Sequence, residues 1–476
     1  MTVKFGTDGW RAVISDTFTF NNLRLVAQAI ADMLQEMYGN GQLEVVIGYD
    51  TRFLSDRYAA EVARVMAGNG IRAWLTRADT PTPAISYTVV HKKATAGIVI
   101  TASHNAPRYN GLKLKSAQGS SASPQQGRLV ERFLERNQEN MHGPNLIDFN
   151  VALRQKLIQK FDPAWAYYEH LGTLVDMDVI SNGELRIVAD PMYGSGRGAL
   201  KEILSRTRCH VQEIRGEMNP GFGGIHPEPM VHYLEALAAA IKSGRGSVGI
   251  ATDGDADRVG AVDNRGEYVD PHRIFALVLR YLLEKRGWRG AVVRTVSTTR
   301  MIDRIAARYN LPLHETPVGF NHIAKYMING DVLMGGEESG GMSIKGHIPE
   351  GDGVLMGLLL LEVIADAGVP LSELVEDLLQ DVGPAHYART DLRLARPVAK
   401  KEMVRRLTER APAEIGGVGV KSVSAIDGVK YLLADDGWLL IRPSGTEPVL
   451  RVYAESPEPG MVKAMLAYGE GVAKES

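Results

Sequence analysis

The stretch SVGIATDGDADRVGAV, residues 247–262, contains the pattern on which the fold assignment rests. Its apolar start, 247–252, predicts a buried strand, and that strand leads straight into a polar loop that carries glycine. The same plan recurs where AGIVI at 96–100 runs into TASHN, and where DVLMGG at 331–336 runs into EESGG. Such strands alternate with helical patterns, which predicts parallel sheets with helices on both faces. Ligands bind at the carboxyl ends of strands in these sheets, so the loops are the candidate functional sites.

The chain is long enough for several domains. Its 476 residues, 45% of them hydrophobic and 23% charged, are typical of a globular protein with three or four domains of roughly 150 residues or fewer. After three βα series the pattern changes to helices at 371–380 and 401–410. Short strands are then expected at 420–425, 429–433, 437–441 and 449–454. This change predicts a separate α+β domain.

Charge and cysteine content exclude several classes of protein. With 54 basic and 56 acidic residues the net charge is −2, so no overall field attracts nucleic acid or an anionic membrane, although a basic pocket stays open. The single cysteine, Cys209, excludes an intramolecular disulfide and a cysteine-rich metal cluster. The N-terminus has no apolar leader, and the most apolar run, 354–361, is too short to span a bilayer. We expect a soluble, cytoplasmic protein without nucleic-acid or membrane partners.

The loop at 253–258 predicts a metal site. Asp253, Asp255 and Asp257 alternate in a short loop between two strands, where their charges repel one another. A divalent cation would relieve that repulsion, and oxygen ligands favour Mg²⁺ or Ca²⁺. The EF-hand pattern is excluded, because Arg258 and Asn264 stand where it requires glycine and glutamate. A solvated acidic turn is the alternative, which the short, directed loop disfavours.

The loop at 101–105 offers a nucleophile. Ser103 lies at the end of a strand beside His104, with Lys113 ten residues further on. A serine so placed could attack a substrate or carry a phosphoryl group. A serine- and asparagine-rich turn explains this loop equally well. No G-x-S-x-G elbow is present, which disfavours an α/β-hydrolase.

Two further loops suit sugar and phosphate. Glu337 and Ser339, on a glycine-rich loop, could bind sugar hydroxyls, although a polar turn explains them as well. The segment RPSGTEP at 442–448, with Arg451 beyond it, combines arginines, hydroxyls and glycine as a phosphate cradle would, with a β-turn as the alternative. It matches neither a Walker A nor a dinucleotide motif. Together the four loops suit phosphoryl transfer on a polyol.

These four motifs resemble those of the α-D-phosphohexomutase superfamily, in the family's order and over essentially the whole chain. TASHN is similar to its phosphoserine loop, DGDADR to its metal loop, GEESGG to its sugar-binding loop and RPSGTEP to its phosphate-binding loop. The resemblance implies three related α/β domains with mixed sheets and a smaller C-terminal α+β domain, in a heart-shaped molecule with a central cleft. The domains, with one of these loops in each, would span 1–150, 151–255, 256–375 and 376–476.

The resemblance also implies a role for each candidate residue. The implied catalytic residues are Ser103, Lys113, Arg11, His104 and Arg258. The implied ligands of Mg²⁺ are Ser103, through its phosphate, Asp253, Asp255 and Asp257. The implied substrate-binding residues are Glu337, Ser339, Arg442, Ser444, Gly445, Thr446 and Arg451. The glutamate and serine would hold the sugar 3- and 4-hydroxyls, and the last five residues would hold the phosphate that is not reacting.

The implied reaction interconverts hexose 1-phosphate and hexose 6-phosphate through a phosphoserine enzyme and a sugar 1,6-bisphosphate. The implied partners are small sugar phosphates, and the enzyme would be a monomer or dimer. Phe320, Glu338 and Gly341 replace the His, Met and His of the dual-specificity bacterial enzymes, which favours glucose. The segment 347–353 resembles phosphoglucomutases, but Gly351 stands where they often have lysine.

Several alternatives remain open. The sugar could be that of a phosphomannomutase or a phosphoglucosamine mutase, and a glucose 1,6-bisphosphate synthase of the same family would carry the same motifs. A metal-dependent phosphatase could phosphorylate Ser103 and then release the phosphate to water. A sugar-phosphate-binding regulator would keep Arg442 but would need neither that serine nor three aspartates.

Overall fold

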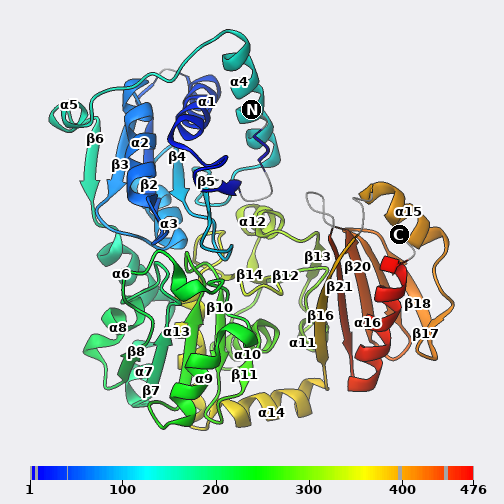
Figure 1. Ribbon diagram of the computed structural model, residues 1–476. Helices are drawn as coiled ribbons and strands as arrows, with labels where there is room; N and C mark the ends of the chain where they lie inside the picture. Colours follow the sequence, from blue (N-terminus) through cyan, green and yellow to red (C-terminus); the bar gives the residue numbers. More distant parts are fainter. Residues whose placement is uncertain (1–2, 6–8, 40, 395–398, 444–448, 475–476) are drawn as a thin grey trace.

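The computed structural model describes residues 3–5, 9–39, 41–394, 399–443 and 449–474. Within them lie four sheets, which define units I to IV: β1–β6, β7–β11, β12–β15 and β16–β21. Figure 1 shows units I, II and III grouped together and unit IV at one side, next to unit III. The predicted fold class, three α/β domains with mixed sheets and a C-terminal α+β domain, is confirmed.

Unit I is a six-stranded mixed sheet in the order β1-β5-β4-β2-β3-β6. Its strands are β1 (Trp10–Val13), β2 (Glu44–Tyr49), β3 (Arg72–Thr76), β4 (Ala96–Ile100), β5 (Tyr109–Lys115) and β6 (Ile158–Phe161). Its helices are α1 (Phe20–Tyr38), α2 (Ser55–Gly68), α3 (Thr82–Lys92), α4 (Pro124–Glu139) and α5 (Phe149–Arg154). Every residue of β4 is buried, as its apolar sequence predicts, and β5 returns antiparallel to it.

Unit II has five strands in the order β11-β10-β9-β7-β8. They are β7 (Arg186–Asp190), β8 (His210–Glu213), β9 (Val248–Thr252), β10 (Val259–Val262) and β11 (Tyr268–Val269). Helices α6 (Ala164–Leu174) and α7 (Met177–Asn182) precede this sheet, and α8 (Ala199–Ile203) and α9 (Glu235–Lys242) lie within the unit, with 3₁₀ turns at Leu204–Arg206, Phe222–Gly224 and Val231–Tyr233. The antiparallel pair β9–β10 encloses the loop 253–258.

Unit III has four strands in the order β13-β12-β14-β15. They are β12 (Ala291–Thr295), β13 (Leu313–Thr316), β14 (Val332–Gly336) and β15 (Met342–Ile344). Its helices are α10 (Pro271–Glu284), α11 (Met301–Arg308), α12 (Phe320–Asn329), α13 (Gly353–Ala367) and α14 (Leu371–Val382). The first three strands are parallel, and β15 returns antiparallel to β14.

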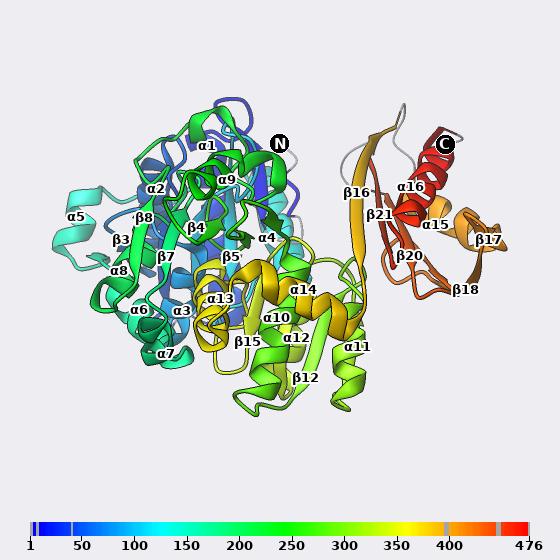
Figure 2. The same cartoon turned by 90° about the horizontal axis from the view of Figure 1, so that it is seen from below.

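Unit IV is an antiparallel sheet in the order β16-β21-β20-β19-β18-β17. Its strands are β16 (His386–Arg393), β17 (Glu414–Ile415), β18 (Val418–Ser424), β19 (Val429–Leu433), β20 (Trp438–Pro443) and β21 (Val449–Ser456). Helices α15 (Lys400–Glu409) and α16 (Pro459–Lys474) complete it. Figure 2 shows the unit from below, again beside unit III and joined to it through β16.

The units as the sheets define them extend past the limits expected from the sequence. Strand β6 pairs with β3 although it lies beyond 150, and β10 pairs with β9 although it lies beyond 255. Helix α14 spans 375. Strand β10 returns to its own sheet directly after the polar loop 253–258, so that loop does not end unit II. Strand β6 joins the sheet of unit I as a parallel edge strand after α4 and α5.

The apolar core is continuous across units II and III. Helices α10 and α13 contribute to one cluster that also contains residues of β7, β9, β12 and β14. Unit I has its own cluster around α1 and α2, and unit IV has one between its sheet and α16. In the described parts of the chain no single helix has both the length and the apolar character to cross a bilayer; α13 and α14 meet that test only as a pair, and they are bent by 86°.

Candidate active site

Three hairpin loops, one each from units I, II and III, meet at one place. In each unit a buried strand is followed by an antiparallel return strand: β4–β5, β9–β10 and β14–β15. Ser103 Oγ of the first loop donates to Asp253 Oδ2 of the second at 2.8 Å. A Cβ on Gly254 would lie 2.5 Å from the Ser103 carbonyl oxygen, and one on Gly340 of the third loop would lie 2.6 Å from that of Val259. The loops therefore meet as closely as only glycine permits.

The loop that carries Ser103 is held by one buried arginine. Arg52 Nη2 donates to the carbonyl oxygens of Ser103 at 2.6 Å and Asn105 at 2.7 Å, and Nη1 reaches two more carbonyls of this segment at 3.0 Å each. Its Nε donates to Asp50 at 3.1 Å. Ser103 has a φ of 51°, which residues other than glycine rarely adopt. The arginine holds the serine in this conformation.

The sequence analysis missed both Asp50 and Arg52. The signal was available, because GYDTR at 48–52 begins in the last two residues of β2 and continues into the following loop. This is the same strand-to-loop pattern as in the loops that were identified. Asp50 also accepts from Thr101 Oγ1 at 2.7 Å, and the Thr101 hydroxyl accepts from the backbone N–H of Ser103 at 2.8 Å. The serine is thus fixed from both sides.

The three aspartates of the second loop form a compact acidic group. Carboxylate oxygens of Asp253, Asp255 and Asp257 lie within 4.8 Å of one another. Burial, together with the two neighbouring carboxylates, raises the pKa of Asp253 well above its usual range. Lys113 Nζ lies 2.8 Å from Asp255 Oδ2 and 2.7 Å from Asp257 Oδ2. An all-oxygen group whose charges repel fits a hard divalent cation such as Mg²⁺.

Further charged groups surround the serine. Arg258 donates to Glu228 at 3.0 Å, and the same carboxylate lies 4.0 Å from His104 Nε2. Burial and the nearby arginine Arg258 lower the pKa of His104 well below its usual range, so the imidazole is neutral at pH 7. Arg11 Nη1 donates to Asn105 Oδ1 at 2.7 Å. No pattern in the sequence marks Glu228, which lies on an irregular segment of unit II.

The third loop presents Glu337 beside this group. Its Oε1 accepts from the backbone N–H of Gly319 at 2.7 Å. Burial raises the pKa of Glu337 to about 7, although the Gly319 N–H and Arg258 oppose the shift. Glu338 accepts from Tyr387 OH at 3.0 Å and from a guanidinium of unit IV. Ser339 lies on the same loop, which connects β14 to its antiparallel neighbour β15.

The phosphate-binding arginines predicted for unit IV lie side by side. Arg442 on β20 and Arg451 on β21 are direct cross-strand neighbours. Arg442 Nε donates to Asp427 at 2.7 Å, and Arg451 Nε lies 3.5 Å from Asp391. The other predicted members of this group, Ser444, Gly445 and Thr446, lie outside the described residues.

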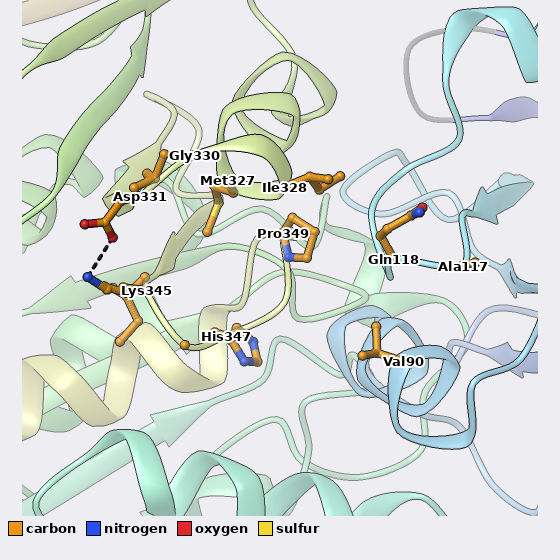
Figure 3. Close-up of a pocket in the computed structure, with 13 residues that line it drawn as sticks. Val90, Ala117, Gln118, Met327, Ile328, Gly330, Asp331, Lys345, His347 and Pro349 are labelled. Atoms are coloured by element: carbon orange, nitrogen blue, oxygen red, sulfur yellow. Dashed lines mark ion pairs between the residues drawn. The ribbon is translucent and has the colours of Figure 1, made fainter.

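A separate hollow lies between units I and III (Figure 3). It has a volume of about 540 Å³ and is lined by residues of both units, among them Val90, Gln118, Met327 and Pro349. His347 lies at its wall, but both ring nitrogens already face partners, His170 at 3.0 Å and an aspartate at 2.9 Å. The hollow contains none of the converging loop residues, so the candidate active site rests on those side chains instead.

Comparison with known families decides the assignment. Models of the phosphoglucomutase/phosphomannomutase α/β/α domains I, II and III match residues 2–141, 165–266 and 270–382, and the model of the C-terminal domain matches 394–467. A phosphoglucomutase of Komagataeibacter xylinus is 31% identical over 95% of this chain and 87% of that protein. The chain belongs to the phosphoglucomutase/phosphomannomutase family. The resemblance noted in the sequence is thereby confirmed.

Relatives divide among several sugars. A phosphoglucosamine mutase of Heliobacterium modesticaldum is 30% identical over 97% of each chain. A solved structure from Thermus thermophilus, assigned as a phosphomannomutase, has a TM-score of 0.85 and 32% identity and covers 100% of this chain and 99% of that one. The chain is therefore a phosphohexomutase, an intramolecular phosphotransferase of carbohydrate metabolism.

Proposed function

We propose that this enzyme interconverts glucose 1-phosphate and glucose 6-phosphate, through a phosphorylated Ser103 and a glucose 1,6-bisphosphate intermediate. The observation that carries the proposal is the 2.8 Å contact between the Ser103 hydroxyl and Asp253 in the three-carboxylate loop. A nucleophilic hydroxyl beside a cation site suits phosphoryl transfer. Membership of a mutase family favours this reaction over the phosphatase and the regulator.

Mg²⁺ is the proposed cofactor. Asp253, Asp255 and Asp257 would hold it together with a phosphate oxygen on Ser103, and when bound it would neutralise charge on the transferring group. The fit rests on the donor set itself: oxygen atoms only, close together, with a raised aspartate pKa that a positive charge would lower.

The chain's own residues would perform the transfer. The Ser103 Oγ–P bond breaks, a P–O bond to the sugar hydroxyl forms, and the hydroxyl proton leaves through Lys113. The Lys113 amine takes up this proton as an ammonium ion, which Asp255 and Asp257 stabilise from 2.8 and 2.7 Å. It gives the proton back to the sugar oxygen that leaves in the second half-reaction. In the second half-reaction the reoriented bisphosphate returns its other phosphoryl group to the serine. Arg52 keeps the serine in place throughout, since its donors hold the loop's carbonyls.

Substrate binding would use both sides of the site. Glu337 would accept hydrogen bonds from the sugar 3- and 4-hydroxyls, and the Ser339 hydroxyl would donate to them. These two hydroxyls exchange places when the intermediate turns over. The phosphate that is not reacting would be held by Arg442, Ser444, Gly445, Thr446 and Arg451. Arg11, His104 and Arg258 would surround the reacting phosphoryl group, because they lie around the serine loop.

The preference for glucose rests on three residues. Phe320, Glu338 and Gly341 replace the residues of the dual-specificity enzymes. Glu338 is engaged by Tyr387 and Arg389 of unit IV, so it shapes the sugar loop rather than reaching the sugar. Mannose and glucosamine phosphates are the competing substrates, since relatives with about the same identity carry those names. We further propose that the enzyme acts in the cytoplasm, as a monomer or dimer, on small sugar phosphates alone.

The test is ³¹P NMR of the purified enzyme with Mg²⁺ and trace glucose 1,6-bisphosphate. The 1-phosphates of glucose, mannose and glucosamine are supplied separately, and Ser103→Ala is run alongside. We expect conversion to the 6-phosphate, fastest for glucose and abolished in the variant. Release of inorganic phosphate alone would establish a phosphatase instead, and faster conversion of another sugar would overturn the glucose assignment.

A further inference from the structure

One buried carboxylate joins the phosphate-binding unit to the sugar-binding loop. Asp427 lies in the turn between β18 and β19 of unit IV and is 7% exposed. Its Oδ2 accepts from Arg442 Nε at 2.7 Å and from the backbone N–H of Val318, in unit III, at 3.1 Å. Its Oδ1 accepts from Lys400 Nζ at 2.6 Å. The carboxylate thus contacts a phosphate-binding arginine and the neighbouring unit at once.

The backbone on the unit III side continues this connection. Val318 N–H points to Asp427, and the next N–H, that of Gly319, donates to Glu337 at 2.7 Å. Two successive backbone amides therefore connect Asp427, the counter-ion of Arg442, to Glu337, the carboxylate proposed to bind sugar hydroxyls. Gly319 has a φ of 127°, a conformation that other residues rarely adopt.

Packing fixes the two ends of the link. A Cβ on Gly428, the residue after Asp427, would lie 2.5 Å from the carbonyl oxygen of Ile441. The turn is thus pressed against β20 immediately before Arg442. On the other side, the Val318 side chain packs against the apolar cluster at the boundary of units III and IV, which contains Val296 and Trp438. Both ends of the connection are fixed by backbone contact or apolar packing and not by an exposed ion pair.

We propose that Asp427 is a positioning residue that sets the distance between phosphate recognition at Arg442 and hydroxyl recognition at Glu337, through the backbone of Val318 and Gly319. The inference rests on the proposed function. It adds that the two recognition elements act together, because a substrate phosphate that fixes Arg442 also fixes Glu337. Groups that share one hydrogen-bond network show coupled effects when either is changed.

The test measures binding without turnover, in Ser103→Ala, by titration calorimetry with glucose 6-phosphate, 3-deoxyglucose 6-phosphate and inorganic phosphate. In this parent the deoxy sugar lacks the 3-hydroxyl that would donate to Glu337, and we expect it to bind about tenfold more weakly. Adding Asp427→Ala removes all three acceptor contacts. We expect the tenfold ratio to fall to about twofold, although Asp427 contacts no sugar hydroxyl.

Two variants separate positioning from loss of structure. Asp427→Asn keeps one oxygen that can accept from Arg442 and Val318, so it should restore most of the ratio. Asp436→Ala removes a carboxylate of the same boundary, which pairs with Arg300 and Arg304 but lies outside the link, and it should leave the ratio at tenfold. If the alanine variant at 427 does not fold, Asp427→Glu, which keeps the charge but displaces it by one methylene, carries the same expected loss.

The outcomes are distinguishable. A parent that discriminates tenfold, with an Asp427→Ala variant that discriminates equally well, overturns this inference and leaves the proposed function standing. An equal loss in Asp436→Ala also overturns it, since any loosening of the boundary would then suffice. A parent that binds neither sugar phosphate, or does not discriminate between them, overturns the proposed function as well.

Discussion

Arg52 shows how one buried side chain can fix the position of the Ser103 hydroxyl without contacting it, by holding the backbone around the serine. Its guanidinium donates to four backbone carbonyls around Ser103 and to Asp50. The planar fork of arginine can reach several acceptors in fixed directions, whereas lysine offers one ammonium group. The position of the serine therefore depends on the shape of this side chain as well as on its charge.

Replacing Arg52 with lysine tests this dependence. Arg52→Lys keeps the buried charge beside Asp50 but loses most of the carbonyl contacts, and we expect kcat to fall about 100-fold, as a displacement of about 1 Å at a reacting atom can produce. Steady-state kinetics on glucose 1-phosphate measures the change, and thermal unfolding checks that the fold persists. Wild-type kcat in the folded variant would show that the loop holds the serine unaided.

Glu337 should make sugar binding depend on pH near neutrality. Burial raises its pKa to about 7, well above its ordinary 4.5. The ionised form accepts from sugar hydroxyls, so affinity for glucose 6-phosphate is present above about pH 7 and falls as the pH drops through that value. Calorimetric titration of the Ser103→Ala enzyme between pH 5.5 and 8.5 gives the profile.

The phosphate of the ligand also titrates, with a second pKa near 6, so a control is needed for that group. Inorganic phosphate and the Glu337→Gln variant supply it. We expect the affinity of Glu337→Gln for glucose 6-phosphate to change with pH only as its affinity for inorganic phosphate does. A pH profile for glucose 6-phosphate that is identical in the parent and the variant would contradict the role of this carboxylate.

At this scale the sequence indicated the candidate reactive residues and missed those that hold them in place. Asp253, Asp255, Asp257 and Ser103 were found because repeated acidic or hydroxyl residues follow strands, and the structure brings them together. Glu228 and Asp427 were missed because each makes its contacts across a unit boundary or far along the chain, with partners 30 and 109 residues away. Nothing in local spacing records such a pairing.

At the scale of elements, the start of α13 contacts the metal loop directly. The helix starts at Gly353, whose N–H donates to the Ala256 carbonyl in the metal loop at 3.0 Å. A Cβ at this position would lie 2.1 Å from the Arg258 carbonyl oxygen. The start of a buried helix therefore supports the loop of three aspartates from beneath.

Gly353→Ala should disturb both stability and the metal loop. The added methyl must displace the backbone of Arg258, and we expect a loss of about 1–3 kcal/mol in the free energy of unfolding, as for other overpacked cores, together with weaker binding of Mg²⁺. Chemical denaturation and calorimetric titration of Mg²⁺ measure the two effects. Gly471→Ala in α16, where a Cβ meets nothing within 4 Å, is the matched control and should be neutral or slightly stabilising.

Elements with a strong local pattern were predicted closely. The strands expected at 420–425, 429–433, 437–441 and 449–454 correspond to β18–β21. Strands β6 and β10, which lie beyond two of the expected domain limits, were harder to interpret. Each is short, and the sequence pattern does not state whether the next strand rejoins the same sheet or starts another.

On the scale of the whole molecule, unit IV has a main apolar core of its own. It meets unit III through a small apolar cluster around Trp438 and through polar contacts. Its apolar cluster is its own, whereas units II and III share one. Across the boundary, Lys430 donates to Glu315 at 3.0 Å, and Arg300 and Arg304 pair with Asp436. Polar contacts of this kind are typical of domains that move relative to one another.

The separate core predicts separate unfolding. Met465 is fully buried in the unit IV cluster, and Met465→Ala should cost about 2–5 kcal/mol. In scanning calorimetry of the full chain we expect more than one transition, with this variant lowering only one of them. Leu359→Ala in α13, within the core shared by units II and III, should lower a different transition. A single transition that both variants shift equally would show that the units unfold together.

The contact between Ser103 and Asp253 also has a consequence for synthesis of the protein. Its two residues are 150 positions apart in the chain. At about 5–20 residues per second a ribosome needs about 8–30 s to add that length. During this interval the serine of a growing chain is present without the carboxylate that accepts its hydrogen bond. The pair is therefore absent from every growing chain that has not reached Asp253, and an interrupted product ending before unit II cannot contain it.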